Sequence, residues 1–168
     1  MASFEHMRSS IITISLFTIF LLVQTVVGQS GYVTYYNPRF EYSIKYPTRV
    51  FTPQEESANG DGRVFTAKGG AELRVWGQYN ALMDTLKGAY ASDLKERGTS
   101  VTYKVLQSNG YVISGTNGSK VYYQKTMLNG SDGDGGAVFA TFTIEYKKSE
   151  KARYDPIVTK IAASFKFD

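Results

Sequence analysis

The residues of this chain that could perform chemistry are carboxylates, hydroxyls and lysines. Among its 168 residues there is no cysteine, and the only histidine is His6. A disulfide framework, a thiolate nucleophile and a Cys/His zinc site are therefore excluded. Catalysis by a histidine base is excluded as well if the segment that carries His6 is removed. We expect neither a cofactor nor a tightly bound transition metal.

Two patterns could support hydrolysis without histidine. Ser92 and Lys95 have the S-x-x-K spacing, in which a lysine one helical turn away deprotonates a serine. Glu41, Glu72 and Glu145 could supply the paired carboxylates of a glycosidase. Each of these glutamates also alternates with apolar neighbours, as residues on any solvated strand face do. A small secreted hydrolase using carboxylates or a Ser/Lys pair is therefore the alternative function.

A glycine-rich stretch offers oxygen ligands for calcium at Asp132 and Asp134. It does not complete an EF-hand loop, because Gly136 and Thr143 stand where a short-chain ligand and a bidentate glutamate are needed. Glycine and aspartate are also the residues that tight turns require. The stretch is therefore either a plain turn or a weak calcium site formed by Asp132 and Asp134.

One face of the expected sheet combines aromatic and polar side chains. In the strand expected over residues 72–78, apolar residues alternate with polar ones and a tryptophan, so the latter point away from the core. Trp, Tyr and Arg are the residue types that most often anchor interfaces. The candidate binding residues on this face are Arg74, Trp76, Tyr122 and Phe139. The alternative is that a loop, such as residues 48–62, covers them.

Alternation of apolar and polar residues predicts strands through most of the chain. They are expected over residues 40–46, 63–67, 72–78, 101–107, 111–114, 120–128 and 137–146. Short glycine-containing turns separate several of them and indicate hairpins. Residues 48–62 are expected to form a long loop.

Two helices interrupt this series of strands. The first has Asn80 as its candidate N-cap and ends at Gly98. The second is expected to begin at Asp155 and Pro156, an N-cap followed by proline at the first helical position. The apolar residues at helical spacing are Leu82, Leu86, Tyr90 and Leu94 in the first helix and Ile157, Ile161 and Phe165 in the second.

The order of strands, helix, strands and helix predicts an α+β domain. We expect an antiparallel sheet of hairpins, with a central and a C-terminal helix packed on its apolar face. This single domain should span residues 29–168.

Residues 1–28 have the three-part layout of a secretory signal peptide. A polar start that carries Arg8 precedes an apolar run over residues 11–23, and small residues stand before Gln29. The alternative is an uncleaved membrane anchor, because about 20 apolar residues suffice to cross a bilayer. We expect cleavage and a secreted or periplasmic protein, which meets the membrane only through residues 1–28 if these are not removed.

The charge of the chain does not indicate a nucleic-acid surface. The formal net charge is only +4, and the densest basic stretch, residues 147–153, is interrupted by Glu150. A nucleic-acid surface needs a larger basic stripe with reading groups between the charges. Asn117 and Asn129 each begin an N-x-S sequon, whose glycosylation depends on the source of the protein.

Three stretches of the chain resemble the PsbP-like superfamily, which includes a photosystem subunit, DcrB-like periplasmic proteins and a nuclear Ran-binding import factor. The shared features are an aromatic strand that ends in Tyr-Pro, a hairpin that ends in Trp-Gly, and a closing helix followed by Ser-Phe. They lie at residues 36–47, 59–77 and 155–165. The resemblance implies an α/β sandwich but no catalytic residue, since members of this superfamily do unrelated jobs.

Together these observations predict a small exported, non-enzymatic binding or accessory protein of the cell envelope. Its partner is expected to be an unknown protein or another envelope component rather than a nucleic acid.

Overall fold

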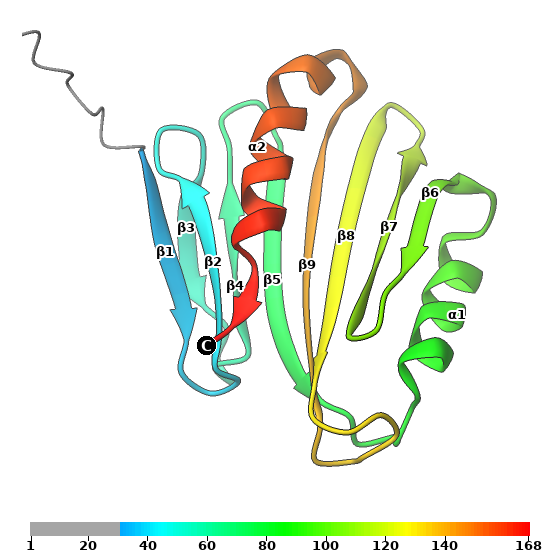
Figure 1. Ribbon diagram of the computed structural model, residues 1–168. Helices are drawn as coiled ribbons and strands as arrows, with labels where there is room; N and C mark the ends of the chain where they lie inside the picture. The colour runs from blue at the N-terminus through cyan, green and yellow to red at the C-terminus, as the bar shows by residue number, and fades with distance from the viewer. Residues whose placement is uncertain (1–30) are drawn as a thin grey trace, which may run out of the picture.

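The computed structural model describes residues 31–168 (Figure 1). The signal peptide expected over residues 1–28 lies outside this described part. The described chain forms two antiparallel sheets and two α-helices, which confirms the α+β fold class. Within residues 31–168, no helix is both long and apolar enough to cross a membrane.

A seven-stranded antiparallel sheet forms the centre of the molecule. Its strands are β3 (Thr52–Glu56), β4 (Gly62–Thr66), β5 (Glu72–Tyr79), β6 (Val101–Leu106), β7 (Gly110–Asn117), β8 (Lys120–Asn129) and β9 (Val138–Lys147). Their order in space is β3-β4-β5-β9-β8-β7-β6. β5 and β9, which are far apart in sequence, pair along their whole length from Glu72 opposite Glu145 to Tyr79 opposite Val138.

A three-stranded sheet and two helices complete the fold. The small sheet has the order β1-β2-β10 and consists of β1 (Tyr32–Asn37), β2 (Tyr42–Pro47) and β10 (Lys166–Phe167). The helices are α1 (Leu86–Arg97) and α2 (Lys151–Ser164), with short 3-10 turns at Gly98–Ser100 and Lys148–Glu150.

α2 and the small sheet cover one face of the large sheet, here called the α2 face (Figure 1). Leu73 and Val75 from β5 and Phe142 and Ile144 from β9 point to this face, and all four are fully buried. Ile161 of α2 belongs to the same buried cluster. The alternation of the sequence predicted this inward set correctly, because successive side chains of a strand point to opposite faces.

α1 packs on the opposite face, here called the α1 face, where it lies against β6 and β7. Leu86 of this helix forms a second buried cluster with Tyr111, Ile113, Tyr122 and Phe139. The expectation that both helices share one apolar face is therefore wrong. The reason is that aromatic and branched side chains also occupy the alternate positions of β7, β8 and β9, so that part of the sheet is apolar on both sides.

Three strands occur where the sequence indicated none. β1 and the short β10 pair with β2, and β3, which lies inside the stretch expected to be a long loop, pairs with β4. β3 holds Pro53 and three exposed polar residues, and its pairing shifts register between Pro53 and Glu56. Proline and charge are typical of edge strands, which is why the alternation signal is absent there.

Both helices begin at residues other than those expected. α1 begins at Leu86, because the Thr85 hydroxyl caps it by accepting the backbone N–H of Gly88 at 3.0 Å. α2 begins at Lys151, so Pro156 lies inside the helix rather than at its first position. Asp155 is likewise no cap, since its carboxylate accepts the hydroxyl of Tyr146 at 2.9 Å.

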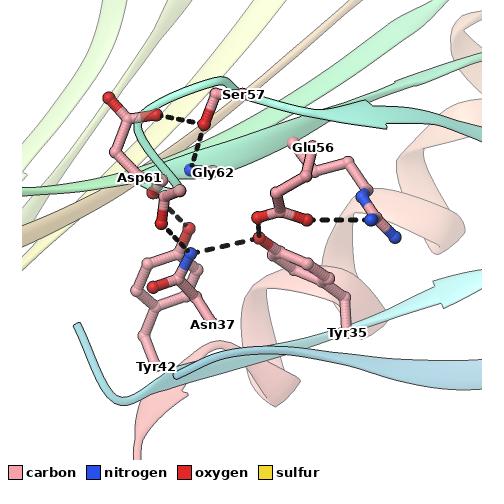
Figure 2. Close-up of polar contacts among 9 residues, drawn as sticks. Tyr35, Asn37, Tyr42, Glu56, Ser57, Asp61 and Gly62 are labelled. Atoms are coloured by element: carbon pink, nitrogen blue, oxygen red, sulfur yellow. Dashed lines mark hydrogen bonds and ion pairs between the residues drawn. The ribbon is translucent and has the colours of Figure 1, made fainter. Parts of the chain in front are cut away.

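Polar side chains join the small sheet to the β3–β4 hairpin (Figure 2). The amide of Asn37 donates to the Gly60 carbonyl at 2.9 Å, and the Tyr42 hydroxyl donates to the Asp61 carbonyl at 2.9 Å. The Tyr35 hydroxyl donates to the carboxylate of Glu56. Burial, together with this bond, raises the pKa of Tyr35 to about 12, so the phenol stays neutral and keeps donating.

We expect Asn37→Ala to lower the free energy of unfolding by about 1–3 kcal/mol, because buried polar groups lose their partners. Asn37 is fully buried, and its carbonyl oxygen also accepts the backbone N–H groups of Arg39 and Phe40. Denaturant unfolding measures the loss. Asn59→Ala is the matched control: among the residues that the structure describes, this exposed side chain bonds only Asp61, so a change within about 0.5 kcal/mol is expected. Equal losses in the two variants would contradict the structural role of Asn37.

Candidate functional site

A groove of about 550 Å³ lies between α1 and the α1 face of the large sheet. Strands β5, β8 and β9 form its floor and one wall, and α1 forms the other wall. The loop between β5 and α1 borders it at the end where the β8–β9 loop lies alongside (Figure 1). The volume is in the usual range of small-ligand and side-chain sites.

Trp76 and Phe139 supply the aromatic part of the groove. They project from β5 and β9 to the same face, because Trp76 pairs with Thr141, two residues along from Phe139. Phe139 is buried beneath α1, whereas Trp76 is half-buried. On its other side Trp76 pairs with Gly62 of β4, which offers no side chain to cover the indole. The tryptophan therefore stays partly open to the groove.

The floor of the groove is polar and buried. Gln124, Thr126 and Thr141 all line it, and each is more than nine-tenths buried. Thr126 and Thr141 are directly opposite one another on β8 and β9, and their hydroxyls share a hydrogen bond of 3.0 Å. Buried polar residues on a sheet face normally find partners within the protein, and here they find them in one another and in α1.

Asp93 connects α1 to this floor. Its Oδ2 accepts the hydroxyl of Tyr111 at 2.6 Å and the amide of Gln124 at 2.5 Å. One turn further on, Arg97 donates to the Gln124 oxygen at 3.1 Å and lies 4.5 Å from the ring centroid of Tyr122. Burial, and to a lesser extent the bond to Asp93, raises the pKa of Tyr111. The Asp93 carboxylate is therefore held in place by fixed donors.

The four candidate binding residues have three different positions. Trp76 and Phe139 line the groove. Arg74 is exposed, pairs with Glu72 at 2.7 Å, and borders a neighbouring hollow of about 400 Å³ that Trp76 also touches. Tyr122 is only 2% exposed and lies in the buried cluster beneath α1. The structure thus brings two of the four together, and the cover over Tyr122 is α1 rather than residues 48–62.

Asp132 and Asp134 both take part in the loop that joins β8 to β9. The Asp132 carboxylate accepts the backbone N–H of Leu86 at 2.5 Å, at the start of α1. The Asp134 carboxylate accepts the N–H of Gly136 at 2.9 Å. In the described part of the chain, no three His, Cys, Asp or Glu residues gather as metal ligands would. Weak calcium binding at Asp132 and Asp134 stays a prediction.

The residues considered for hydrolysis do not converge on one cavity. Ser92 lines the groove, while Lys95 is exposed and lies outside its lining. Glu72 and Glu145 are cross-strand neighbours on the α1 face, and each forms an ion pair, with Arg74 and Lys120 respectively. Glu41 stands apart at the turn before β2.

Asp93 was not identified as a site residue from the sequence, and the three residues of the polar floor were not among the candidate binding residues. Gln124, Thr126 and Thr141 alternate with inward residues, so a strand pattern does assign them to the α1 face. Asp93 lies on α1, and long-range tertiary contacts determine where this helix lies over the sheet. No pattern in the sequence indicates that a helical carboxylate meets Tyr111 and Gln124.

The fold is a PsbP-like α+β sandwich, as the three resembling stretches suggested. No family model matches the chain, and no curated protein matches it. Solved structures do match.

One is the solution structure of cyanobacterial PsbP (CyanoP) from Synechocystis sp. PCC 6803, with a TM-score of 0.59 and 14% identity, over 85% of this chain and 96% of that one. Another is the Ran-binding protein Mog1p of Saccharomyces cerevisiae, with a TM-score of 0.48 and 11% identity, over 81% of this chain and 95% of that one. At these identities, the likeness to CyanoP establishes the fold alone.

The different burial of Trp76 and Phe139 predicts different costs of truncation. Phe139→Ala should lower the free energy of unfolding by about 3–5 kcal/mol, because it opens a cavity beneath α1. Trp76→Ala should cost only about 1–2 kcal/mol, because the indole is half-buried at the groove. Denaturant unfolding of both variants makes the comparison. A loss at Trp76 as large as that at Phe139 would show that the indole is a core residue.

Proposed function

We propose that this protein is a small non-enzymatic binding or accessory protein of the cell envelope, which holds its partner in the groove beside Trp76. The observation that carries the proposal is the groove itself, with a half-buried tryptophan next to buried polar groups. Binding sites usually combine aromatic or apolar surface with placed polar groups, and this groove has both. Tryptophan is also prominent among the residues that dominate binding energy.

The ion pairs of the α1 face favour binding over hydrolysis. Two of the three glutamates considered for glycoside cleavage are paired with basic residues on the solvated part of the sheet. A glycosidase needs two carboxyl groups facing one bond at a fixed separation. The proposed partner is a protein or another envelope component, because the modest net charge and the absence of a basic stripe in the sequence do not favour nucleic acid.

Export is the second part of the proposal. We expect residues 1–28 to be removed as a signal peptide, which would leave a mature protein that begins near Gln29. N-terminal sequencing or intact-mass measurement of the protein from the cell envelope or the medium tests this. Recovery of the chain in the membrane fraction with residues 11–23 still attached would contradict it.

The binding role predicts that Trp76 is needed for partner capture. The mature protein is immobilised, exposed to an envelope extract, and compared with Trp76→Ala. Capture of a specific component should fall roughly tenfold in the variant, as for an interface anchor. Tyr103→Ala is the matched control, because Tyr103 is an exposed aromatic residue on β6 outside the groove. Identical capture by wild type and Trp76→Ala would refute a working surface at the groove.

A further inference from the structure

We propose that the groove recognises a lysine or arginine side chain of a partner polypeptide, with Asp93 as its counterion. This inference rests on the proposed binding function and specifies the chemistry of the partner. Three observations support it: the charge of the groove, the free acceptor atom of Asp93, and the apolar residues at its rim.

The first observation is uncompensated negative charge. Asp84, Asp93 and Glu96 all line the groove, and none of them forms an ion pair within residues 31–168. Arg97 also lines it but is occupied by Gln124 and the Tyr122 ring. The carboxylates that do pair with lysine or arginine lie elsewhere: Glu56, Glu72, Glu145, Glu150, Asp155 and Asp168. In a chain of net charge +4, this groove is therefore locally acidic.

The second observation is an unused acceptor on Asp93. Both of its hydrogen bonds go to Oδ2, and within the described residues no group donates to Oδ1. The carboxylate is half-buried and fixed by Tyr111 and Gln124, so a cation would meet it already oriented. Hydrogen bonds between a cation and a carboxylate are about twice as strong as those between neutral groups.

Two hydroxyl groups lie close by. Thr126 and Thr141 share one hydrogen bond, and the Thr126 hydroxyl also interacts with the Tyr111 phenol. Both threonine side chains are more than nine-tenths buried and line the groove. Gln124 contacts both Asp93 and Thr126, which places these polar side chains beside the carboxylate.

The aromatic wall suits the stem of such a side chain. Lysine and arginine bury their methylene groups against apolar surface while the charged end stays polar. Trp76 and Phe139 line the groove together with Asp93. An indole face also attracts a nearby cation directly.

The third observation is the apolar rim, which favours a polypeptide over a free amine. Leu82 and Met83, in the loop that leads into α1, are 85% and 67% exposed, and Tyr79 at the end of β5 is 52% exposed. Tyr79 and Leu82 also line the groove. Large apolar side chains gathered in one exposed place mark interaction surfaces. Residues on either side of an inserted lysine would cover this rim.

The test uses three probes and the fluorescence of Trp76, the only tryptophan of the chain. They are the peptide acetyl-Leu-Lys-Leu-amide, the same peptide with Nε-acetyl-lysine, and butylamine. The lysine peptide should change the fluorescence saturably and bind at least about tenfold more tightly than either other probe. Its affinity should fall as salt rises, because the partly exposed charges are screened.

Variants assign the preference to Asp93. Asp93→Asn keeps an oxygen for Tyr111 and Gln124 but removes the charge, so the preference for lysine over Nε-acetyl-lysine should disappear. Glu96→Gln, at an exposed position, should weaken the lysine peptide by a few fold without disturbing the fold. Glu41→Gln is the matched control, since Glu41 is an exposed carboxylate outside the groove that forms no ion pair with another described residue.

Each outcome decides the inference separately from the binding function. If both peptides bind equally at Trp76, recognition of a cation is refuted while the groove remains a binding site. If butylamine binds as tightly as the lysine peptide, the inference that the groove recognises a polypeptide is refuted. If no probe binds, the inference fails, and capture dependent on Trp76 then decides whether the proposed function fails as well.

Discussion

The fold depends on the burial of a single sheet from both sides. β9 lies at its centre, where Ala140, Phe142 and Ile144 meet α2 and the small sheet, while Phe139 and Thr141 face the opposite way and are also buried. Both faces of such a strand must be covered, because its side chains alternate strictly between them. The small sheet, α2 and α1 are therefore all needed as covers, and their contacts follow from this one requirement.

The sequence predicted most of this sheet because alternation is a local signal. The strands expected over residues 72–78, 120–128 and 137–146 correspond to β5, β8 and β9, and the inward residues Ala140, Phe142, Ile144 and Tyr146 of β9 are buried. β3 was missed because Pro53 and its glutamates replace the apolar alternation at the sheet edge. The predicted start of α2 was wrong because proline after aspartate is typical of the first turn of a helix. In the structure, Pro156 lies inside the helix.

The candidate site was predicted only where a strand carries it. Trp76 and Phe139 follow from alternation, and both line the groove. Tyr122 follows the same rule, yet it is covered, because alternation gives the face of a sheet and not what lies above it. Asp93 could not be found in this way. Its role arises only when α1 packs against β6 and β7 and brings Asp93 to Tyr111 and Gln124, a long-range arrangement that no spacing within the helix encodes.

The position of the groove follows from the incomplete cover of the α1 face. α1 packs over β6 and β7, so the apolar cluster lies beneath it, while no second element of residues 31–168 covers the sheet beyond its edge. Buried polar groups are tolerated at that boundary because Asp93, Gln124 and the threonine pair satisfy most of one another's hydrogen bonds. The same bonds fix the groups before any partner arrives, so little ordering is left for the moment of binding. At the edge of the core beneath α1, the side chains are polar because solvent begins there. The same polar side chains make this edge suitable for recognising a partner.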